Sequence, residues 1–455
     1  MKRLRILPRL LILIAISLSA CAPTAPRFQY KSDSALRKLT EQAAPAFPAV
    51  HFAIFSDPHI YDPSLGTEGS AFEAYLNSDR ELLREGPEIL QSVLTDIVKD
   101  SPAFVLVTGD LTKDGEASSH ALAISYLQQL KAAGIQAYVV PGNHDIRNGL
   151  SYRYQGDRTE RVPNVTADEF ARLYADFGYN QALQRDPGSL SYLVEPAPGL
   201  WLLALDSCRY RDNQEGQEET VGGKFLPATI KWIEDTLAEA ARQNKAVIVM
   251  MHHGILQHFS SQSKDFAEYL LEDYSAVARM FAAYNVRMVF TGHFHAQDIV
   301  MACEPDNKFL YDIETGSLVS YPNSYRLVSI TTVQQATINS WQITAILSHP
   351  ADFPAFARAT LLEGVSQITI KTMAGYKVGQ AEAESLAPQV AAAFLAHYSG
   401  DESLPAGQEI IRSKGLTLPG WVVVTFRKGL LVSLWNDLAP ADSALTINLT
   451  TGESQ

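Results

Sequence analysis

The sequence predicts an α/β fold followed by a helical segment, and three observations carry this prediction. Between residues 49 and 347, short apolar runs of strand length alternate with segments of helical spacing, as expected for a sheet whose faces are covered by helices. Tyr325–Val333 and Ala336–Leu347 follow one another without a helical segment and predict antiparallel strands that close this domain. After residue 350 the pattern becomes mainly helical.

The predicted elements of the first domain follow in a regular order. Apolar runs bounded by turn-forming residues predict strands, and apolar residues spaced three and four apart predict helices. The strands are expected at Val50–Phe55, Phe104–Val107, Ala137–Val140, Leu200–Leu205, Ala246–Met251 and Arg287–Phe290, and the helices at Ile89–Lys99, Ser119–Ala133, Phe225–Ala241 and Tyr274–Tyr284.

The segment 350–455 is predicted to be a smaller, mainly α-helical domain. Gln380–Tyr398 is rich in alanine with helical spacing, and Ala355–Gly375 indicates another helix. Trp421–Phe426 and Leu430–Leu434 fit either short strands or buried helical segments. Because few of its residues are of types that catalyse reactions or bind metals, we expect this domain to pack against the first one and stabilise it.

Composition sets limits on the class of protein. The chain has 455 residues, of which 46% are hydrophobic and 19% charged, which excludes a disordered chain, a collagen and a disulfide-dense miniprotein. The formal net charge of −13 repels polyphosphate backbones, so no stable nucleic-acid partner is expected. A small anionic substrate remains compatible with this charge where bound metal inverts the local field. The oligomeric state is left open.

The N-terminal residues have the pattern of a secretion signal. A basic start is followed by the apolar run Leu10–Leu18, which is too short to span a bilayer but fits the core of a signal peptide. Leu18-Ser19-Ala20-Cys21 resembles a bacterial lipobox, so residues 1–20 are the predicted signal peptide, 21–48 a tether and Cys21 the lipidated residue. The expected location is therefore extracytoplasmic, at a membrane. An ordinary signal peptide is the alternative, and pairing of Cys208 with Cys303 is left open.

Metal-competent side chains follow five of the predicted strands, which is the most informative pattern in the chain. In open α/β sheets, sites form where the carboxyl ends of strands meet loops. A single such strand end is more often a turn, but five in order are not explained by turns and predict a metal site. The five segments are Ser56–His59, Thr108–Asp110, Pro141–Asp145, Met251–His253 and Thr291–His295.

The residue types in these segments narrow the choice of metal. They offer carboxylates, imidazoles and one amide but no thiolate, which suits Mn, Fe or Zn and argues against a structural zinc finger. Seven donors are too many for one ion and suit two ions that share a bridging carboxylate. Either member of His252-His253 fits as a ligand, because strand alternation points the two side chains to opposite faces. The candidate ligands in these segments are Asp57, His59, Asp110, Asn143, either His252 or His253, His293 and His295.

These motifs, in this order, resemble those of the calcineurin-like metallophosphoesterase family. The resemblance covers about residues 50–347 and implies a four-layer αββα sandwich that hydrolyses phosphoesters by attack of a metal-bridging hydroxide. It places His252, not His253, among the ligands and Asp110 between the ions. It gives His144 the role of stabilising the transition state or protonating the leaving group, with Asp145 orienting it. Its implied ligand sets are Asp57, His59 and His295 for one ion, and Asn143, His252 and His293 for the other.

Further segments resemble the cyclic-nucleotide phosphodiesterase branch of that family, in which a group of bacterial lipoproteins carries a helical C-terminal domain. The segments are Gly109–Glu116, Val139–Ile146, Asp176–Tyr179 and Ser189–Leu193. The expected activity is hydrolysis of a small phosphodiester, such as a cyclic nucleotide. A phosphomonoesterase, a membrane-anchored binding protein that retains the metal site, and a nuclease acting on long DNA are the alternatives.

Specificity is expected to come from long loops around the site. The loops are Tyr61–Arg84, Arg147–Arg161 and Tyr210–Lys224, with Tyr61, Arg80, Arg147, Tyr210 and Arg211 as candidate substrate contacts. His258 fits either a pocket wall or an exposed loop. The remaining histidines, His51, His120, His349 and His397, are interpreted as structural.

Overall fold

Two β-sheets lie face to face in the computed structural model, which describes residues 26–77 and 79–455. Their contact is direct, because the rings of Phe52 and Phe290, one from each sheet, meet edge to face at 5.5 Å between centroids. The first sheet has the order β15 (Ala444–Asn448), β14 (Gln335–Gln342), β13 (Ser324–Ile330), β1 (Val50–Phe55), β2 (Phe104–Val107), β3 (Gln136–Val139). The second has the order β11 (Asp298–Glu304), β12 (Lys308–Glu314), β10 (Met288–Thr291), β9 (Ala246–Met251), β8 (Leu200–Leu205), β7 (Tyr192–Ala197), β6 (Gln184–Arg185).

The central strands of each sheet are parallel. In the first sheet β1, β2 and β3 run parallel, with Phe52 opposite Phe104 in the register, and β13 runs antiparallel to β1. In the second sheet β8, β9, β10 and β12 are parallel. Neighbouring parallel strands end at the same edge of their sheet. The polar segments after β1, β2 and β3 are therefore gathered at one edge of the first sheet. Those after β9 and β10 are gathered at one edge of the second sheet.

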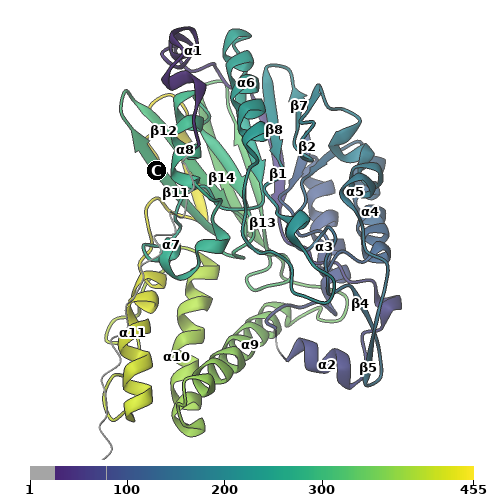
Figure 1. The fold of residues 1–455 in the computed structure, drawn as a ribbon, viewed down its shortest axis with the longest axis vertical. Helices are drawn as coiled ribbons and strands as arrows, with labels where there is room; N and C mark the ends of the chain where they lie inside the picture. Colours follow the sequence, from purple (N-terminus) through teal and green to yellow (C-terminus); the bar gives the residue numbers. More distant parts are fainter. Residues whose placement is uncertain (1–25, 78) are drawn as a thin grey trace, which may run out of the picture.

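Helices cover the outer face of each sheet, giving four layers (Figure 1). Alternate residues of β8 show this division: Leu202 and Ala204 belong to the core between the sheets, while Leu203 and Leu205 pack under the outer helices. Helices α3 (Gly86–Asp100), α4 (Ala117–Ala132) and α5 (Ala167–Leu173) accompany the first sheet, and α6 (Pro227–Arg242) and α8 (Tyr274–Ala283) the second.

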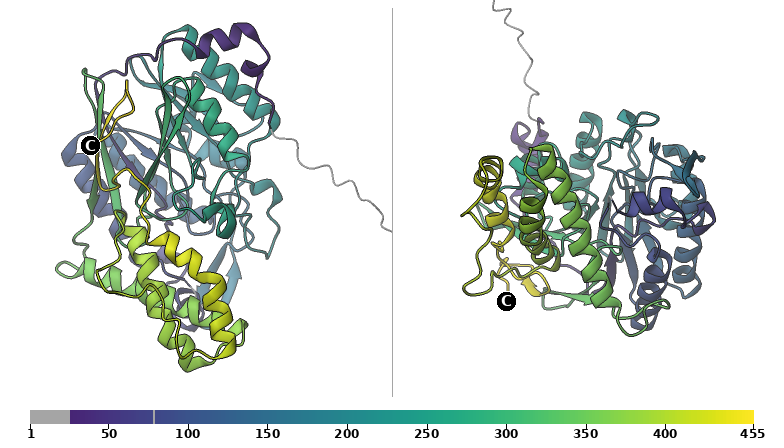
Figure 2. Two further views of the ribbon diagram at one scale, coloured as in Figure 1. Left: turned by 90° about the vertical axis from the view of Figure 1, so that its left-hand side faces the viewer. Right: turned by 90° about the horizontal axis from the view of Figure 1, so that it is seen from below.

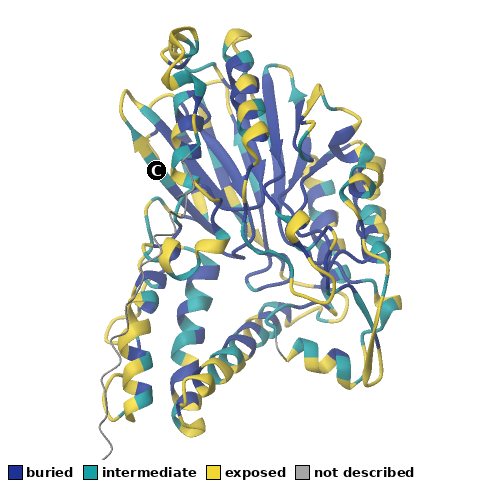
Figure 3. Cartoon of the chain, viewed as in Figure 1, coloured by how far each residue is buried: buried dark blue, intermediate teal, exposed yellow. Residues whose placement is uncertain are grey.

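This architecture confirms the αββα sandwich that the family resemblance implied. The alternation of strands and helices alone predicted one sheet with helices on both faces, which is wrong. A run that is apolar at every position shows only that both faces of a strand are buried, and here one face is buried by the second sheet. The antiparallel pair predicted at the end of the domain is confirmed as β13 and β14. In Figure 3 the central strands of both sheets, such as β2, β8, β9 and β10, are buried, whereas β6 and β14 carry exposed residues.

Three long helices lie together at one end of the sandwich (Figures 1 and 2). They are α9 (Phe353–Gly375), α10 (Gln380–Ser399) and α11 (Leu418–Leu434), and we call them the helical end. The runs Trp421–Phe426 and Leu430–Leu434, whose sequence fitted either strands or helical segments, both lie in the single helix α11. The core of the helical end includes Phe259 and Phe294 of the sandwich, so it packs directly on the loop that follows β10.

The last residues of the chain return to the sandwich. After α11, β15 pairs antiparallel with β14 and becomes the edge strand of the first sheet. The predicted boundary at 347–350 therefore separates the helices from the sheets along the chain, but residues 444–448 belong to the sandwich in space.

Smaller elements surround these layers. Helices α1 (Ser34–Thr40), α2 (Ser70–Leu76) and α7 (Gln262–Asp265) and the hairpin of β4 (Tyr152–Gln155) and β5 (Arg158–Arg161) lie in connections. Among the described residues, no helix combines the length and hydropathy needed to cross a membrane. The predicted signal peptide and Cys21 lie outside the described residues. Cys208 is buried, Cys303 is exposed, and neither forms a disulfide.

Candidate metal centre

The backbone is left-handed at most of the predicted metal ligands. The φ angles are 49° at Asp57, 38° at His59, 47° at Asp110, 79° at His293 and 69° at His295. This region costs a residue with a side chain on the order of 1–3 kcal/mol, and such residues gather at functional sites. Five of them at adjacent strand ends indicate that the fold holds these side chains in a specific arrangement.

Two glycines allow the strand ends to approach one another closely. A Cβ atom on Gly142 would lie 2.0 Å from Oδ1 of Asp110. One on Gly292 would lie 2.0 Å from Oγ of Ser56 and 2.5 Å from Oδ2 of Asp57. Any larger residue at either position therefore displaces a predicted ligand, which explains why glycine precedes Asn143 and His293 in these motifs.

The first group of predicted ligands consists of Asp57, His59 and His295. The Nε2 atoms of the two histidines lie 3.3 Å apart, and Oδ1 of Asp57 lies 3.9 Å from Nε2 of His59 and 3.5 Å from Nε2 of His295. All three side chains are buried. Their nitrogen and oxygen atoms converge within the distance at which they can share one ion.

The second group consists of Asn143, His252 and His293. Nε2 of His252 lies 3.0 Å from Oδ1 of Asn143, and the His252 and His293 rings are 4.5 Å apart between centroids. Nδ1 of His252 is 2.9 Å from the carbonyl oxygen of Thr108. A proton on that nitrogen satisfies the carbonyl and leaves Nε2 free to face the group, as in histidines that bind metals.

Asp110 lies between the two groups. Its Oδ2 atom is 3.6 Å from Nε2 of His59 in the first group and 3.3 Å from Nε2 of His252 in the second. The other oxygen, Oδ1, accepts a hydrogen bond of 2.9 Å from the backbone N–H of His144. Burial opposes ionisation of Asp110, but the histidines around it, His252 first, hold its pKa well below the usual range. An ionised carboxylate with one oxygen facing both groups has the placement of a bridging ligand.

The chemistry of these donors fits metal ions. Oδ1 of Asp57 and Nε2 of His293 are buried and have no hydrogen-bond partner among the described residues. Buried polar atoms of native proteins are nearly always paired, so unpaired ones need an explanation such as an ion. The carboxylates and imidazoles that converge here have too few hydrogen-bond donors among them to pair every acceptor atom. Such a group is well matched to divalent cations.

His253 lies beside this site but is engaged elsewhere. Its Nδ1 is 2.7 Å from Oγ of Ser207, and its Nε2 is 2.8 Å from the carbonyl oxygen of Val221. Both ring nitrogens therefore have protein partners, whereas Nε2 of His252 faces the predicted ligands. This arrangement favours His252 as the ligand, in agreement with the order of the family motif.

His144 faces the first group from the side that solvent reaches. Its ring centroid lies 5.0 Å from that of His59, and its side chain is 24% exposed, in contrast to the buried ligands. Nδ1 is 3.1 Å from Asp114 and Nε2 is 3.3 Å from Glu219. Burial opposes protonation of His144, but the surrounding carboxylates, Glu219 first among them, raise its pKa well above the usual value. A protonated imidazole here can donate to an anionic substrate.

The carboxylate of Asp145, which the family resemblance expects to orient His144, contacts backbone groups of two loops. It accepts hydrogen bonds from the backbone N–H groups of Gly142 at 2.8 Å, Leu111 at 3.1 Å and Thr112 at 2.9 Å. It thereby joins the loops after β2 and β3, and the carboxylates that contact the His144 ring are those of Asp114 and Glu219. Asp145 therefore shapes the loops that carry Asp110 and Asn143.

The sequence interpretation did not identify three acidic residues at the site. They are Asp114 and Glu219, which flank His144, and Glu81, whose Oε1 is 3.9 Å from Nε2 of His59 and 3.7 Å from Nδ1 of His295. Glu81 and Glu219 belong to two of the loops that were expected to surround the site. For Glu81 and Glu219, the length of these loops was therefore the only sign in the sequence that they lie at the site.

The five candidate substrate contacts lie in different surroundings. Tyr61 and Tyr210 are buried, and their hydroxyls donate to the Tyr152 carbonyl and to Asp206. Arg211 donates to the carbonyl of Gly188. Arg147 borders a shallow cavity near β4 and β5, and only Arg80, which donates to the Tyr398 hydroxyl at 3.0 Å, adjoins a residue of the metal centre, Glu81.

His258 is neither a pocket wall nor an exposed loop residue. It is buried, and its Nδ1 lies 2.7 Å from Oδ1 of Asp298. Asp298 also faces His397, which is hydrogen-bonded to Glu402. This buried network of acids and imidazoles joins β11 to the end of α10, so we interpret it as the seam between the sandwich and the helical end.

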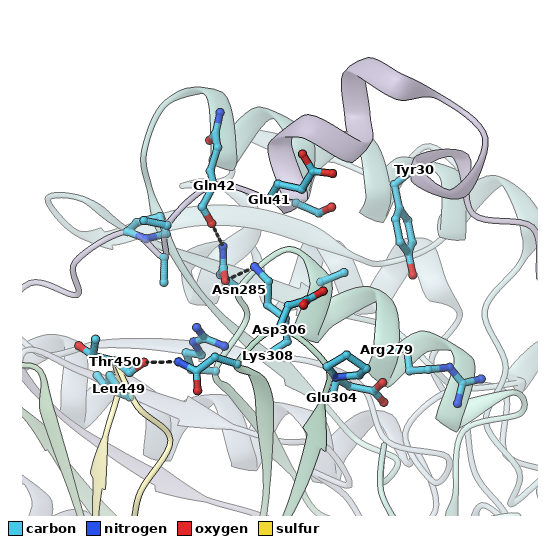
Figure 4. A pocket seen from close by; sticks show the side chains of 18 of the residues that line it. Tyr30, Glu41, Gln42, Arg279, Asn285, Glu304, Asp306, Lys308, Leu449 and Thr450 are labelled. Carbon is cyan, nitrogen blue, oxygen red and sulfur yellow. Dashed lines mark hydrogen bonds between the residues drawn. The ribbon is translucent and has the colours of Figure 1, made fainter.

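A large cavity of the described chain lies away from these residues. It has a volume of about 1150 Å³ and is bordered by the N-terminal segment, α8 and the β11–β12 hairpin. Figure 4 shows its lining, in which Arg279 and Lys308 lie near Glu304 and Asp306. None of the predicted site residues lines it.

One family model matches the part of the chain that carries these residues. Residues 50–297 match the family model of calcineurin-like phosphoesterases, while no curated protein sequence matches the chain.

Among solved structures, a dimetal phosphatase from Danio rerio is 14% identical, with 66% of this chain and 96% of that chain covered and a TM-score of 0.45. The sulfate thiohydrolase SoxB of Thermus thermophilus is 12% identical over 70% of this chain and 61% of that one, with a TM-score of 0.34. The phosphopantetheinyl hydrolase of Mycobacterium tuberculosis is 11% identical over 60% and 90% of the two chains, with a TM-score of 0.28.

Proposed function

Because this chain belongs to the calcineurin-like phosphoesterase family, we propose that it is a dinuclear-metal phosphodiesterase acting on a small phosphodiester. The observation that carries this proposal is the position of Asp110, whose Oδ2 faces a histidine of each ligand group. A single-ion site needs no such shared carboxylate. Two bound ions would activate a water molecule and clamp the phosphoryl group.

The residues around the metal centre support phosphoryl transfer. His144 is exposed on the side from which a substrate approaches, and the carboxylates around it favour its protonated form. In that form its N–H donates to a phosphoryl oxygen or supplies a proton to the leaving oxygen. Asp114 holds the ring through Nδ1, which leaves Nε2 for the substrate once Glu219 is displaced from it.

A phosphodiester is the substrate class that the cyclic-nucleotide phosphodiesterase motifs favour. If Cys21 carries a lipid, the protein works outside the cytoplasm. We therefore propose an external phosphodiester, such as a 2′,3′-cyclic nucleotide from RNA breakdown or a diester derived from the cell envelope. Phosphomonoesters are the second candidate class, because the same metal centre serves both reactions.

The test is a comparison of initial rates on four substrates with metal-loaded protein. The substrates are 2′,3′-cyclic AMP, 3′,5′-cyclic AMP, bis(4-nitrophenyl) phosphate and 4-nitrophenyl phosphate, each also measured after treatment with a chelator. We expect chelator-sensitive hydrolysis of the diesters at higher kcat/KM than the monoester. Monoester turnover without diester turnover would contradict the phosphodiesterase proposal, and absence of all turnover would favour a binding protein.

A further inference from the structure

A largely apolar cavity of about 400 Å³ lies between the helical end and the sandwich. Its walls come from all three long helices, and they include Val365 and Ile368 of α9, Val390 and Phe394 of α10, and Val424 and Leu431 of α11. This volume is within the range of small-molecule sites, which are mostly apolar with a few polar groups. A well-packed core has few voids larger than a water molecule, so ordinary packing does not account for this space.

The cavity shares a wall with the metal centre. The ring of Tyr269 lines the cavity and lies 4.6 Å from the ring of His293 between centroids. Tyr398 also lines it and lies 6.5 Å from His295. Only one layer of side chains therefore separates the cavity from histidines of both ligand groups.

The polar groups of the cavity are placed at its metal-centre wall and at its rim. Arg80 lines that wall, donates to the Tyr398 hydroxyl, and precedes Glu81, which faces His59 and His295. Arg427 and Lys428 of α11 stand at the exposed rim, and apart from Asp265, Thr369 and Thr372 the rest of the lining is apolar or aromatic. This lining suits the apolar part of a ligand, and the adjoining metal centre suits an anionic end.

Helix α11 also exposes apolar side chains to the outside of the cavity. Leu418 is 74% exposed, Trp421 52% and Phe426 76%. Exposed apolar groups that cluster on one element mark contact with an apolar ligand or surface. The same helix thus presents apolar groups on the cavity wall and outside it, which suits a ligand that arrives with an apolar chain.

We propose that this cavity binds the hydrocarbon chain of an amphipathic phosphoester whose phosphate lies at the metal centre, with the chain passing the edge of the side-chain layer formed by Tyr269 and Tyr398. The inference rests on the proposed function for the position of the phosphate, and it goes beyond it by naming the apolar part of the substrate. Burial of each methylene group contributes about 0.8 kcal/mol, equivalent to about a fourfold gain in affinity per methylene until the chain fills the cavity.

The first test measures binding and does not depend on turnover. Methyl, butyl and octyl phosphate are titrated into the metal-loaded protein by calorimetry. We expect the Kd to fall at least about tenfold from methyl to octyl phosphate, since several methylene groups become buried. Equal Kd values for the three probes would overturn the inference, whatever the protein hydrolyses.

Variants locate the effect in the cavity. Thr369→Trp fills the cavity from α9, because Thr369 lines it, while Thr425→Trp places the same side chain on the exposed surface of α11. The first variant is expected to lose the advantage of octyl over methyl phosphate and keep the Kd for methyl phosphate. The second is expected to behave as the wild type. A chain-length advantage that survives in Thr369→Trp would overturn the inference even if the wild type shows it.

Turnover separates the two proposals. The substrates are 4-nitrophenyl diesters that carry a methyl, butyl or octyl group on the same phosphate. Turnover that does not vary with chain length, together with equal Kd values, would leave the phosphodiesterase proposal intact and overturn the inference. A chain-length effect on Kd without hydrolysis of any diester would support the cavity and contradict the phosphodiesterase.

Discussion

The strand ends of the sandwich and the helical end meet at the metal centre, but they contribute different things to it. The strand ends supply buried donors on a left-handed backbone, with glycines where the loops approach one another. The helical end supplies apolar side chains around a cavity and, through Tyr398 of α10, the part of its wall next to His295, while Tyr269 of the sandwich forms the part next to His293. In our account the strand ends carry out the reaction and the helical end selects the substrate.

This difference has a consequence for mutation. A donor at a strand end has one position that works, so its loss should abolish the reaction for every substrate. The cavity is bordered by many interchangeable apolar residues, so a change there should alter the preference among substrates and leave the reaction in place. The predictions below test this division, beginning with the largest expected effect.

Asp110→Asn should be the most damaging single change. The amide cannot replace a carboxylate shared by two groups, so both groups lose affinity for metal. We expect turnover to fall by more than about 100-fold, the upper range for a residue that merely supports a ligand, and metal content to fall further than in His59→Ala. Metal analysis and initial rates check this. Full metal content in Asp110→Asn would show that Asp110 does not bridge.

His144→Ala should separate metal binding from catalysis. Because His144 lies beside the ligands without joining either group, metal content should remain that of the wild type. Turnover should fall by about 10²–10⁴-fold, the usual scale for one acid–base group. His349→Ala is the matched control, since the His349 side chain has a similar exposed fraction of 25% and lies before α9 with Asp352 as its partner. A wild-type rate in His144→Ala would remove this residue from the mechanism.

Glu402→Ala tests the seam between the two regions. The change removes the carboxylate that is hydrogen-bonded to buried His397 and leaves only the more distant Asp298 facing it. Loss of the hydrogen-bond partner of a buried polar group costs about 1–3 kcal/mol of unfolding free energy. Chemical denaturation measures this loss, while metal content should not change. Glu384→Ala on the exposed face of α10 is the matched control. Equal destabilisation by both changes would mean that the buried network does not hold the two regions together.

Cys21→Ser should have the smallest effect on the enzyme and a large effect on its location. If Cys21 is lipidated, the variant should move from the membrane fraction to the soluble fraction of cells, because two or three acyl chains are what makes such an anchor stable. Rates of the purified variant should equal those of the wild type. Membrane fractionation that persists in Cys21→Ser would contradict lipidation.

The two regions also differ in how far the sequence predicts them. The strand β1 (Val50–Phe55) was predicted with its observed bounds, because a short apolar run between turn signals has few alternatives. The residues that the motifs singled out at five strand ends, among them Asp57 and Asp110, lie together in space. Assignment of each as a metal ligand remains a prediction.

What the sequence did not predict depends on tertiary contacts. Glu81 and Glu219 reach the site from loops whose sequence carries no motif, so only the folded chain shows their positions. The Trp421–Phe426 run is rich in β-branched valine, which favours strands locally, yet packing against α10 makes it helical. The cavity is lined by residues scattered over 80 to 431, and no local pattern indicates it.

The most direct test of the account is a titration of metal-free protein with Mn, Fe or Zn, in which turnover of a diester is measured against ions bound per chain. We predict that turnover appears as the second ion binds and reaches its maximum at two ions per chain, because Asp110 faces both ligand groups. Full turnover with one ion bound, or in the presence of a chelator that removes all metal, would contradict a dinuclear centre.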